Sequence, residues 1–260
     1  MLLYNTVFLY SFILVMQIFQ FVAQAGIVGF ESPASQYEEA RLSISELLVP
    51  NPSSTHLAFA KDNALSHIGI YKHDILIVNK NMPTRNNPIV VATLNGEPIV
   101  RLLDRKKRML QGAMSAQSYT LRDDDDFYIQ GAVDFSIRLH TANDYPAYEC
   151  ATPEMIDDII IKHPSATYFG LAQGHSMMNV GIFDGDILIV DRHQFINDGA
   201  VIVATLNGEF VCKKLDKAQR RLVSTKPYSF YQLSERDRFQ VEGCVIASVR
   251  LHSSLNMSLN

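Results

Sequence analysis

The sequence predicts a mainly β protein made of two tandem β-rich lobes that follow an apolar N-terminal arm. Two observations lead to this fold class. A long stretch of the chain is repeated 112 positions further on, and both copies contain short apolar runs rich in β-branched residues, bounded by turn-forming residues. Hydrophobic residues make up 47% of the 260 residues and charged residues 19%, a balance that excludes a wholly disordered chain.

The internal repeat sets the expected domain organisation. Residues 52–104 align with residues 164–216 without a gap, with 20 identical pairs among 53. Two stretches are identical: Asp74–Val78 over Asp186–Val190, and Val91–Glu97 over Val203–Glu209. We therefore expect four segments: an arm at 1–29, a first lobe at 30–138, a linker at 139–150 and a second lobe at 151–252.

An Asn-Gly pair marks the clearest turn in each copy. Asn207-Gly208 separates the apolar run Ala200–Leu206 from Glu209–Lys213, and Asn95-Gly96 is its counterpart. A type I′ turn requires positive φ at both central residues, which Asn and Gly tolerate. Each lobe is therefore expected to contain a β-hairpin at this point.

The two copies differ at two positions suited to chemistry. Ser176 aligns with Ala64, and Lys213 aligns with Arg101. A serine hydroxyl becomes a good nucleophile when a neighbouring base removes its proton, and a lysine can be that base once desolvation has lowered its pKa. A guanidinium stays protonated at physiological pH and cannot replace it. These differences predict Ser176 as nucleophile and Lys213 as general base, with Ala64 and Arg101 as degenerate counterparts in an inert first lobe.

Taken singly, the serine and the lysine are weak evidence, since most such residues lie in cores, turns or solvated faces. His175 next to Ser176 suggests a Ser-His pair, but neighbouring residues on an extended strand point to opposite faces. The sequence contains no HExxH, P-loop or dinucleotide-binding motif, and we expect no metal and no cofactor.

Four motifs of the second copy are specific in combination. They are His163–Phe169, Gly174-x-Ser176-Met177, Gly181–Asp191 and Gly208–Leu215. With the spacing of 37 residues from Ser176 to Lys213, they resemble the LexA/UmuD family of self-cleaving Ser-Lys peptidases. The resemblance covers roughly residues 164–250, and the first copy resembles the family more loosely. It implies that both lobes share the β-rich fold of these peptidases.

The resemblance also implies a cleavage site. Members of the family are cut before a glycine in an N-terminal arm, and Gly29–Ala34 resembles the segment that follows the cut. The candidate bonds are Ala25-Gly26 and Val28-Gly29, of which we favour Ala25-Gly26 because it fits the Ala-Gly preference of the LexA relatives. The linker before the second lobe contains neither Ala-Gly nor Cys-Gly, so that lobe is expected to lack an arm of its own.

By resemblance, the protein acts in SOS mutagenesis after DNA damage. A RecA–single-stranded DNA filament would stimulate cleavage, and the trimmed protein would join a UmuC-like polymerase to form the error-prone translesion DNA polymerase V. The tandem chain is expected to be a homodimer or an internal pseudo-dimer, in which the first lobe supplies the arm and the second the Ser-Lys pair. Two other functions remain open: a non-proteolytic binding partner of a polymerase or RecA, and a membrane-tethered Ser-Lys peptidase.

The apolar N-terminus bears on localisation. Residues 2–25 carry no charge and are long enough to span a bilayer as a helix, and Ala23-Gln24-Ala25 fits a signal-peptidase site. The alternatives to a membrane or export signal are an apolar arm that packs on the protein and an incorrectly chosen start. The lack of Lys or Arg before the apolar run argues against export. Three cysteines without CxxC spacing favour a reducing compartment. We expect a cytoplasmic protein, with membrane association through residues 2–25 as the alternative.

The charge distribution gives little reason to expect DNA binding by the protein as a whole. The net charge is −4, and no helix-turn-helix precedes the first copy, so direct sequence-specific DNA binding is not expected. The basic cluster Arg105–Arg108 and the acidic run Asp123–Asp126 are interpreted as solvated turns.

Overall fold

The computed structural model describes residues 43–81, 87–141 and 151–252. The arm at 1–29, with both candidate cleavage bonds, and most of the expected linker lie outside these residues. No helix within the described ranges has the length and apolar character needed to cross a membrane. The described residues form two compact units. We call Ile44–Ile160 together with Ser248–His252 the first lobe, and Ile161–Ala247 the second lobe.

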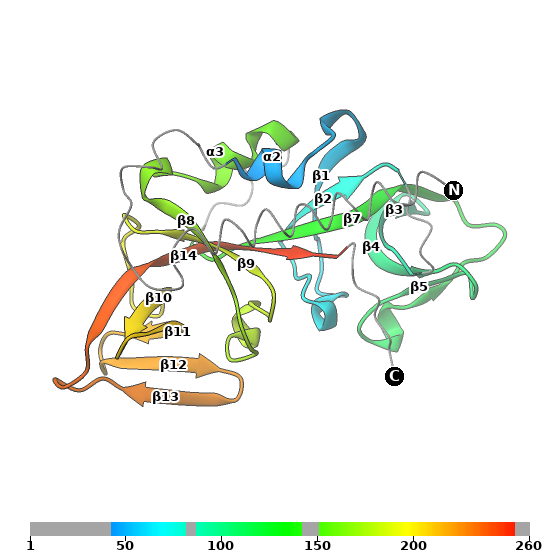
Figure 1. Cartoon of the computed structure of the whole chain (residues 1–260). Helices are drawn as coiled ribbons and strands as arrows, with labels where there is room; N and C mark the ends of the chain where they lie inside the picture. Colours follow the sequence, from blue (N-terminus) through cyan, green and yellow to red (C-terminus); the bar gives the residue numbers. More distant parts are fainter. Residues whose placement is uncertain (1–42, 82–86, 142–150, 253–260) are drawn as a thin grey trace, which may run out of the picture. The chain divides into compact units, whose positions relative to one another are not determined.

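The first lobe is an antiparallel β structure with two short α-helices (Figure 1). Its main sheet has the order β7-β3-β4-β5-β6, while β2 pairs with β7 and β1 pairs with β2. The strand β2 is apolar and buried along most of its length, as expected for a strand that lies between two neighbours. The elements are α2 (Ile44–Leu48), β1 (Thr55–Phe59), β2 (Ile75–Asn79), β3 (Ile89–Leu94), β4 (Glu97–Asp104), β5 (Met109–Gln111), β6 (Tyr119–Thr120), β7 (Phe127–Leu139) and α3 (Ile156–Ile160).

The second lobe repeats this arrangement strand for strand. Its sheet has the order β14-β10-β11-β12-β13, while β9 pairs with β14 and β8 pairs with β9. Its strands are β8 (Thr167–Leu171), β9 (Ile187–Asp191), β10 (Val201–Leu206), β11 (Glu209–Asp216), β12 (Arg221–Thr225), β13 (Tyr228–Gln232) and β14 (Phe239–Leu251), whose last residues belong to the first lobe. The mainly β fold and the tandem duplication predicted from the sequence are therefore confirmed.

The two lobes share local irregularities as well as strand order. The register shifts between Val91 and Ala92 in the first lobe, and between the aligned Val203 and Ala204 in the second. Both predicted Asn-Gly turns have the positive φ angles of a type I′ hairpin, 51° and 83° in the first lobe and 53° and 92° in the second. The predicted hairpins are confirmed.

The helix α3 belongs to a different lobe from the one expected. It falls in the segment 151–252 that we expected to form the second lobe, but it packs with α2 of the first lobe. The Asp157 carboxylate accepts hydrogen bonds from the Ile44 N–H at 2.5 Å and the Ser45 N–H at 3.3 Å. Such N–H groups at a helix start have no partner within the helix, so a carboxylate from a distant segment fixes α3 there.

The end of β14 also packs with the first lobe. The His252 N–H donates to the Asp134 carbonyl at 2.8 Å, and the His252 Nε2 lies 2.8 Å from the Ser136 Oγ. A matching contact places the His140 Nε2 3.0 Å from the Ser248 Oγ. Burial lowers the pKa of His140 to about 3, so this imidazole is neutral. The first lobe is therefore discontinuous in sequence.

Among the described residues, apolar side chains form two clusters in each lobe. In the second lobe, one cluster includes Met177, Leu188, Val190 and Val245. Because Met177 is buried in it, the backbone of the preceding Ser176 is anchored at the edge of a packed core.

A buried ion pair ties two parts of the first lobe together. Arg138 on β7 binds Asp74 through two nitrogens, with the Nε 3.0 Å from Oδ1 and the Nη2 2.9 Å from Oδ2. The Asp74 side chain is only 5% exposed. Burial raises the pKa of Asp74, although the Arg138 guanidinium opposes this change. The carboxylate is thus tolerated because its partner is present.

Replacing Arg138 by Met is expected to lower the free energy of unfolding of the first lobe by about 3 kcal/mol, because a buried carboxylate loses its partner. Since the folded-state pKa of Asp74 is raised, protonation favours the folded state, and the deficit should shrink as the pH falls through that pKa. Urea unfolding at neutral and acid pH measures both effects. Arg108→Met, which breaks an exposed ion pair with Asp123, should cost less than about 1 kcal/mol. Equal losses in the two variants would contradict the role given to burial.

Candidate active site

Ser176 and Lys213 lie together in the second lobe. Ser176 is in the loop between β8 and β9, and Lys213 is on β11. The Lys213 Nζ donates a hydrogen bond to the Ser176 Oγ at 2.9 Å. Gly174, two residues before Ser176, has a φ of 79°, a conformation that glycine adopts without strain. The structure therefore brings together the two residues that the sequence comparison selected.

The backbone of Ser176 is held by the turn that joins β12 to β13. Its carbonyl accepts hydrogen bonds from the Thr225 N–H at 2.6 Å, the Lys226 N–H at 3.0 Å and the Thr225 Oγ1 at 3.0 Å. The Asn179 Nδ2 donates in turn to the Thr225 carbonyl at 2.6 Å. These bonds fix the position from which the Ser176 hydroxyl projects. Neither Thr225 nor Lys226 was predicted from the sequence as part of the site.

The surroundings of Lys213 favour its neutral form. Lys213 is half-buried, whereas the neighbouring Lys214 is exposed, as the alternation along a strand predicts. Burial lowers the pKa of Lys213, because an ammonium group loses hydration when it leaves water. Burial also raises the pKa of the adjacent Cys212 thiol to about 12, so this thiol is neutral and provides no counter-charge. A lowered pKa is the property that a lysine base requires.

An ion pair occupies the aligned position of the first lobe. The Arg101 Nη2 lies 3.0 Å from the Asp62 Oδ2, and the Arg101 Nε donates to the Gln117 carbonyl at 3.1 Å. The Asp62 Oδ1 also accepts a hydrogen bond from the Ala64 N–H at 2.9 Å. Gly174 aligns with Asp62 and has no side chain that could do the same. Ala64 and Arg101 were predicted from the sequence but Asp62 was not, although the alignment pairs Asp62 with Gly174.

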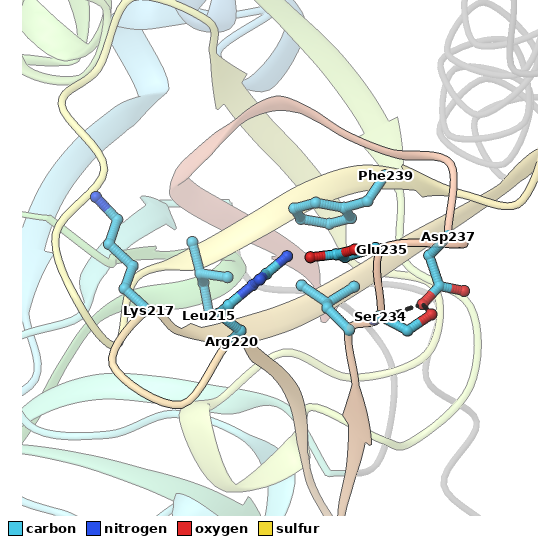
Figure 2. A pocket seen from close by; sticks show the side chains of 8 residues that line it. Leu215, Lys217, Arg220, Ser234, Glu235, Asp237 and Phe239 are labelled. Atoms are coloured by element: carbon cyan, nitrogen blue, oxygen red, sulfur yellow. Dashed lines mark hydrogen bonds between the residues drawn. The ribbon is translucent and has the colours of Figure 1, made fainter.

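A separate hollow of about 400 Å³ opens elsewhere in the second lobe (Figure 2). Its lining consists of Leu215, Lys217, Arg220, Leu233, Ser234, Glu235, Asp237 and Phe239. Figure 2 shows the Arg220 guanidinium and the Glu235 carboxylate pointing toward each other below the Phe239 ring. Neither Ser176 nor Lys213 lines this hollow.

No cluster of His, Cys, Asp or Glu within the described ranges could hold a metal ion. Cys212 and Cys244 are free thiols. Burial raises the pKa of Cys244 to about 11, which keeps its thiol protonated and unreactive at neutral pH.

Comparison with known proteins gives a family match over most of the chain. The profile of the family described as Peptidase S24-like matches residues 20–133 and again residues 137–246. Protein ImpA of Salmonella typhimurium is 35% identical over 92 residues, which cover 35% of this chain and 62% of ImpA. Protein MucA of Escherichia coli is 42% identical over 60 residues, covering 23% of this chain and 41% of MucA.

A third relative is a LexA repressor of Acidithiobacillus ferrooxidans (strain ATCC 53993 / BNL-5-31), 38% identical over 99 residues. This alignment covers 35% of the chain and 48% of the repressor. The chain thus matches less than two thirds of the length of each of these relatives.

The Lys213 amine is expected to titrate below the ordinary lysine value of about 10.4, because it is partly removed from water. The pH dependence of its ¹³Cε chemical shift measures this, with Lys213→Arg used to assign the signal. Ser176→Ala should leave the lowered midpoint in place, since burial is its main cause. A midpoint at or above the ordinary value would contradict the assignment of Lys213 as a base.

Proposed function

Because the chain belongs to the Peptidase S24-like family, we propose that it is a self-cleaving serine peptidase that uses Ser176 as nucleophile and Lys213 as general base. The observation that supports this most directly is the 2.9 Å hydrogen bond between the Lys213 Nζ and the Ser176 Oγ. The lowered pKa of Lys213 adds to it, because only the neutral amine can accept a proton. The first lobe, with Ala64 and Arg101 in the same positions, is inert in this proposal.

The reaction follows from the geometry of these groups. Neutral Lys213 takes the proton of the Ser176 hydroxyl as the oxygen attacks the carbonyl carbon of the scissile bond. The resulting ammonium returns the proton to the leaving amine, and water then hydrolyses the acyl-serine ester with Lys213 again acting as base. The first product keeps the new carboxylate, and the second begins with the glycine.

The oxyanion that develops during attack needs a hydrogen-bond donor. In the first lobe, the Ala64 N–H is bonded to the Asp62 carboxylate at 2.9 Å. In the second lobe, Gly174 replaces Asp62, so the Ser176 N–H is not capped in this way and can donate to the oxyanion. Asp62 would therefore remove an oxyanion donor from the first lobe, in addition to the loss of the serine and the lysine.

The substrate in this proposal is the N-terminal arm, cut at Ala25-Gly26 or, as the alternative, at Val28-Gly29. Both bonds lie outside the described residues. The dyad is in one lobe and the arm precedes the other, which suggests that the chain works as an internal pseudo-dimer. A homodimer in which one chain cuts another would serve the same chemistry.

The biological role that we propose is that of UmuD, with RecA–single-stranded DNA filaments as the stimulus and a UmuC-like polymerase as the partner of the trimmed protein. The resemblance of the second copy to the LexA/UmuD family supports this role, together with the similarity to the proteins named ImpA, MucA and LexA repressor. Membership of error-prone DNA polymerase V belongs to the same proposal.

Purified protein is expected to convert into a product that begins at Gly26, and Ser176→Ala or Lys213→Ala should reduce the rate by at least about a thousandfold, because nucleophile and base act as a unit. Intact mass before and after incubation, with and without RecA, single-stranded DNA and a nucleotide, reports both the activity and the bond. Ser165→Ala and Lys162→Ala, at exposed positions of the same lobe, should cleave normally. Equal trimming of the Ser176→Ala protein would leave the chain as a non-proteolytic partner.

Cleavage without RecA should become faster as the pH rises and then level off, since the active form of Lys213 is the neutral one. The midpoint of the rate profile should fall below the ordinary lysine pKa and agree with the midpoint of the ¹³Cε titration. The profile is measured as first-order rate constants over a series of buffers. A rate that declines between neutral and alkaline pH would be inconsistent with a lysine base.

A further inference from the structure

The strand β13 carries two aromatic rings in an unusual setting. Tyr228 and Phe230 are 69% and 52% exposed, and β13 ends the sheet order of the second lobe (Figure 1). Residues two apart on a strand project from the same face, about 7 Å from each other. The residue between them, Ser229, projects from the opposite face. Two neighbouring ring surfaces are thus presented to solvent side by side.

The Phe230 ring is supported from within the sheet. The Arg221 guanidinium lies 4.6 Å from the ring centroid and is itself held by Asp216, with the Nη2 2.6 Å from the carboxylate Oδ2. Cross-strand register places Lys214, Val223 and Phe230 in one row, so the exposed Lys214 lies on the face of the two rings. The face therefore combines aromatic surfaces with a nearby cation.

The sequence around this strand is rich in basic residues, although the whole chain is acidic. Residues 214–238 contain seven Lys or Arg and three Asp or Glu, against a net charge of −4 for the protein. The basic residues include Lys226 just before β13 and Arg236 and Arg238 just after it. Arg220, which directly precedes β12, contributes a guanidinium to the hollow shown in Figure 2.

From these features we propose that the exposed face of β13 and its basic surroundings bind a single-stranded polynucleotide, by stacking of bases on Tyr228 and Phe230 and by contacts of Lys and Arg with phosphates. Every base has a flat face, so such a surface works without reading the base sequence. Pairs of exposed aromatic residues on a strand, separated by a small residue and preceded by a cation, stack bases in other β-sheet proteins. Lys226, Pro227 and the segment Tyr228–Phe230 follow this pattern.

The first lobe provides an internal comparison. Ala116 and Ser118 align with Tyr228 and Phe230, and a 3₁₀ turn at Ser115–Gln117 takes the place of the first residues of the strand. Residues 102–126 contain five Lys or Arg and five Asp or Glu, hence no net charge. The aromatic and basic face is therefore not needed to form the fold.

A protein that adds a strand along β13 is the competing occupant. It would bond to the outward backbone groups of Tyr228 and Phe230, because the Leu233 N–H donates to the Arg220 carbonyl and the alternate residues Tyr231 and Ser229 therefore face β12. The charge favours the polynucleotide, because a phosphate backbone pairs with a row of cations whereas an added strand needs none of them.

The test uses the full chain with Ser176→Ala, so that its outcome does not depend on cleavage. Fluorescence anisotropy of a labelled oligothymidylate of about 12 nucleotides measures binding at low salt. Tyr228→Ala and Phe230→Ala should each weaken binding about tenfold, and Tyr228→Trp should retain it, since a larger ring still stacks. The matched control is Tyr128→Ala, which removes a 66% exposed ring on β7 and should change nothing.

The charge contribution is measured by the salt dependence of the same affinity. Lys214→Ala should reduce the slope of log K against log salt by about 0.7, whereas Lys106→Ala in the basic turn of the first lobe should not. The proposal is overturned if the oligonucleotide does not bind, or if it binds with an affinity that both ring substitutions leave unchanged. Binding lost in Lys106→Ala but kept in Tyr228→Ala would likewise overturn it, by placing the site on the first lobe.

Discussion

The carbonyl of Ser176 accepts three hydrogen bonds from the turn between β12 and β13, and the geometry of the candidate site depends on this contact. Ser176 lies in the loop between β8 and β9, where burial of the neighbouring Met177 anchors the backbone on one side and these bonds hold the Ser176 carbonyl on the other. The contact joins the loop to the hairpin formed by β12 and β13. The Lys213 Nζ lies 2.9 Å from this hydroxyl, because Lys213 is on β11 and the loop that carries Ser176 is bonded to the same sheet. In the first lobe the Ala113 N–H donates the aligned hydrogen bond to the Ala64 carbonyl. This backbone contact is therefore present in the lobe that lacks the serine and the lysine.

The two lobes show how a shared frame can support different electrostatics. Partial burial lowers the pKa of Lys213, because an ammonium group loses hydration when it leaves water. Arginine keeps its charge under the same conditions and requires a counterion, which Asp62 supplies at 3.0 Å. The carboxylate that satisfies Arg101 also bonds to the Ala64 N–H. The Asp62 carboxylate thus contacts both the Arg101 guanidinium and the Ala64 N–H, two groups whose counterparts have no such partner at Gly174 in the second lobe.

Many of the strands and turns could be predicted from the sequence, because the internal duplication allows two copies of the same unit to be compared position by position. The repeat predicted the strand runs and the two Asn-Gly hairpins, and it singled out Ser176 and Lys213, whose side chains lie 2.9 Å apart. The contacts of Thr225 with Ser176 could not be predicted, since they depend largely on backbone N–H groups, which have no signature in the side chains. The packing of α3 against α2 was not predicted either. It depends on a hydrogen bond between Asp157 and Ile44, which are 113 positions apart in the sequence, and an alignment of the two copies does not report such contacts.

The turn at Thr225 and Lys226 serves two purposes through different atoms. Its backbone N–H groups hold the Ser176 carbonyl, while the chain that follows presents the Tyr228 and Phe230 rings to solvent. Backbone groups constrain side-chain identity little, so the strand beyond the turn was free to acquire aromatic residues without disturbing Ser176. The first lobe supports this separation, because it keeps the aligned backbone bond from Ala113 while carrying small residues in place of the rings. The candidate site and the exposed face of β13 can therefore be altered independently, although only Pro227 separates Lys226 from Tyr228.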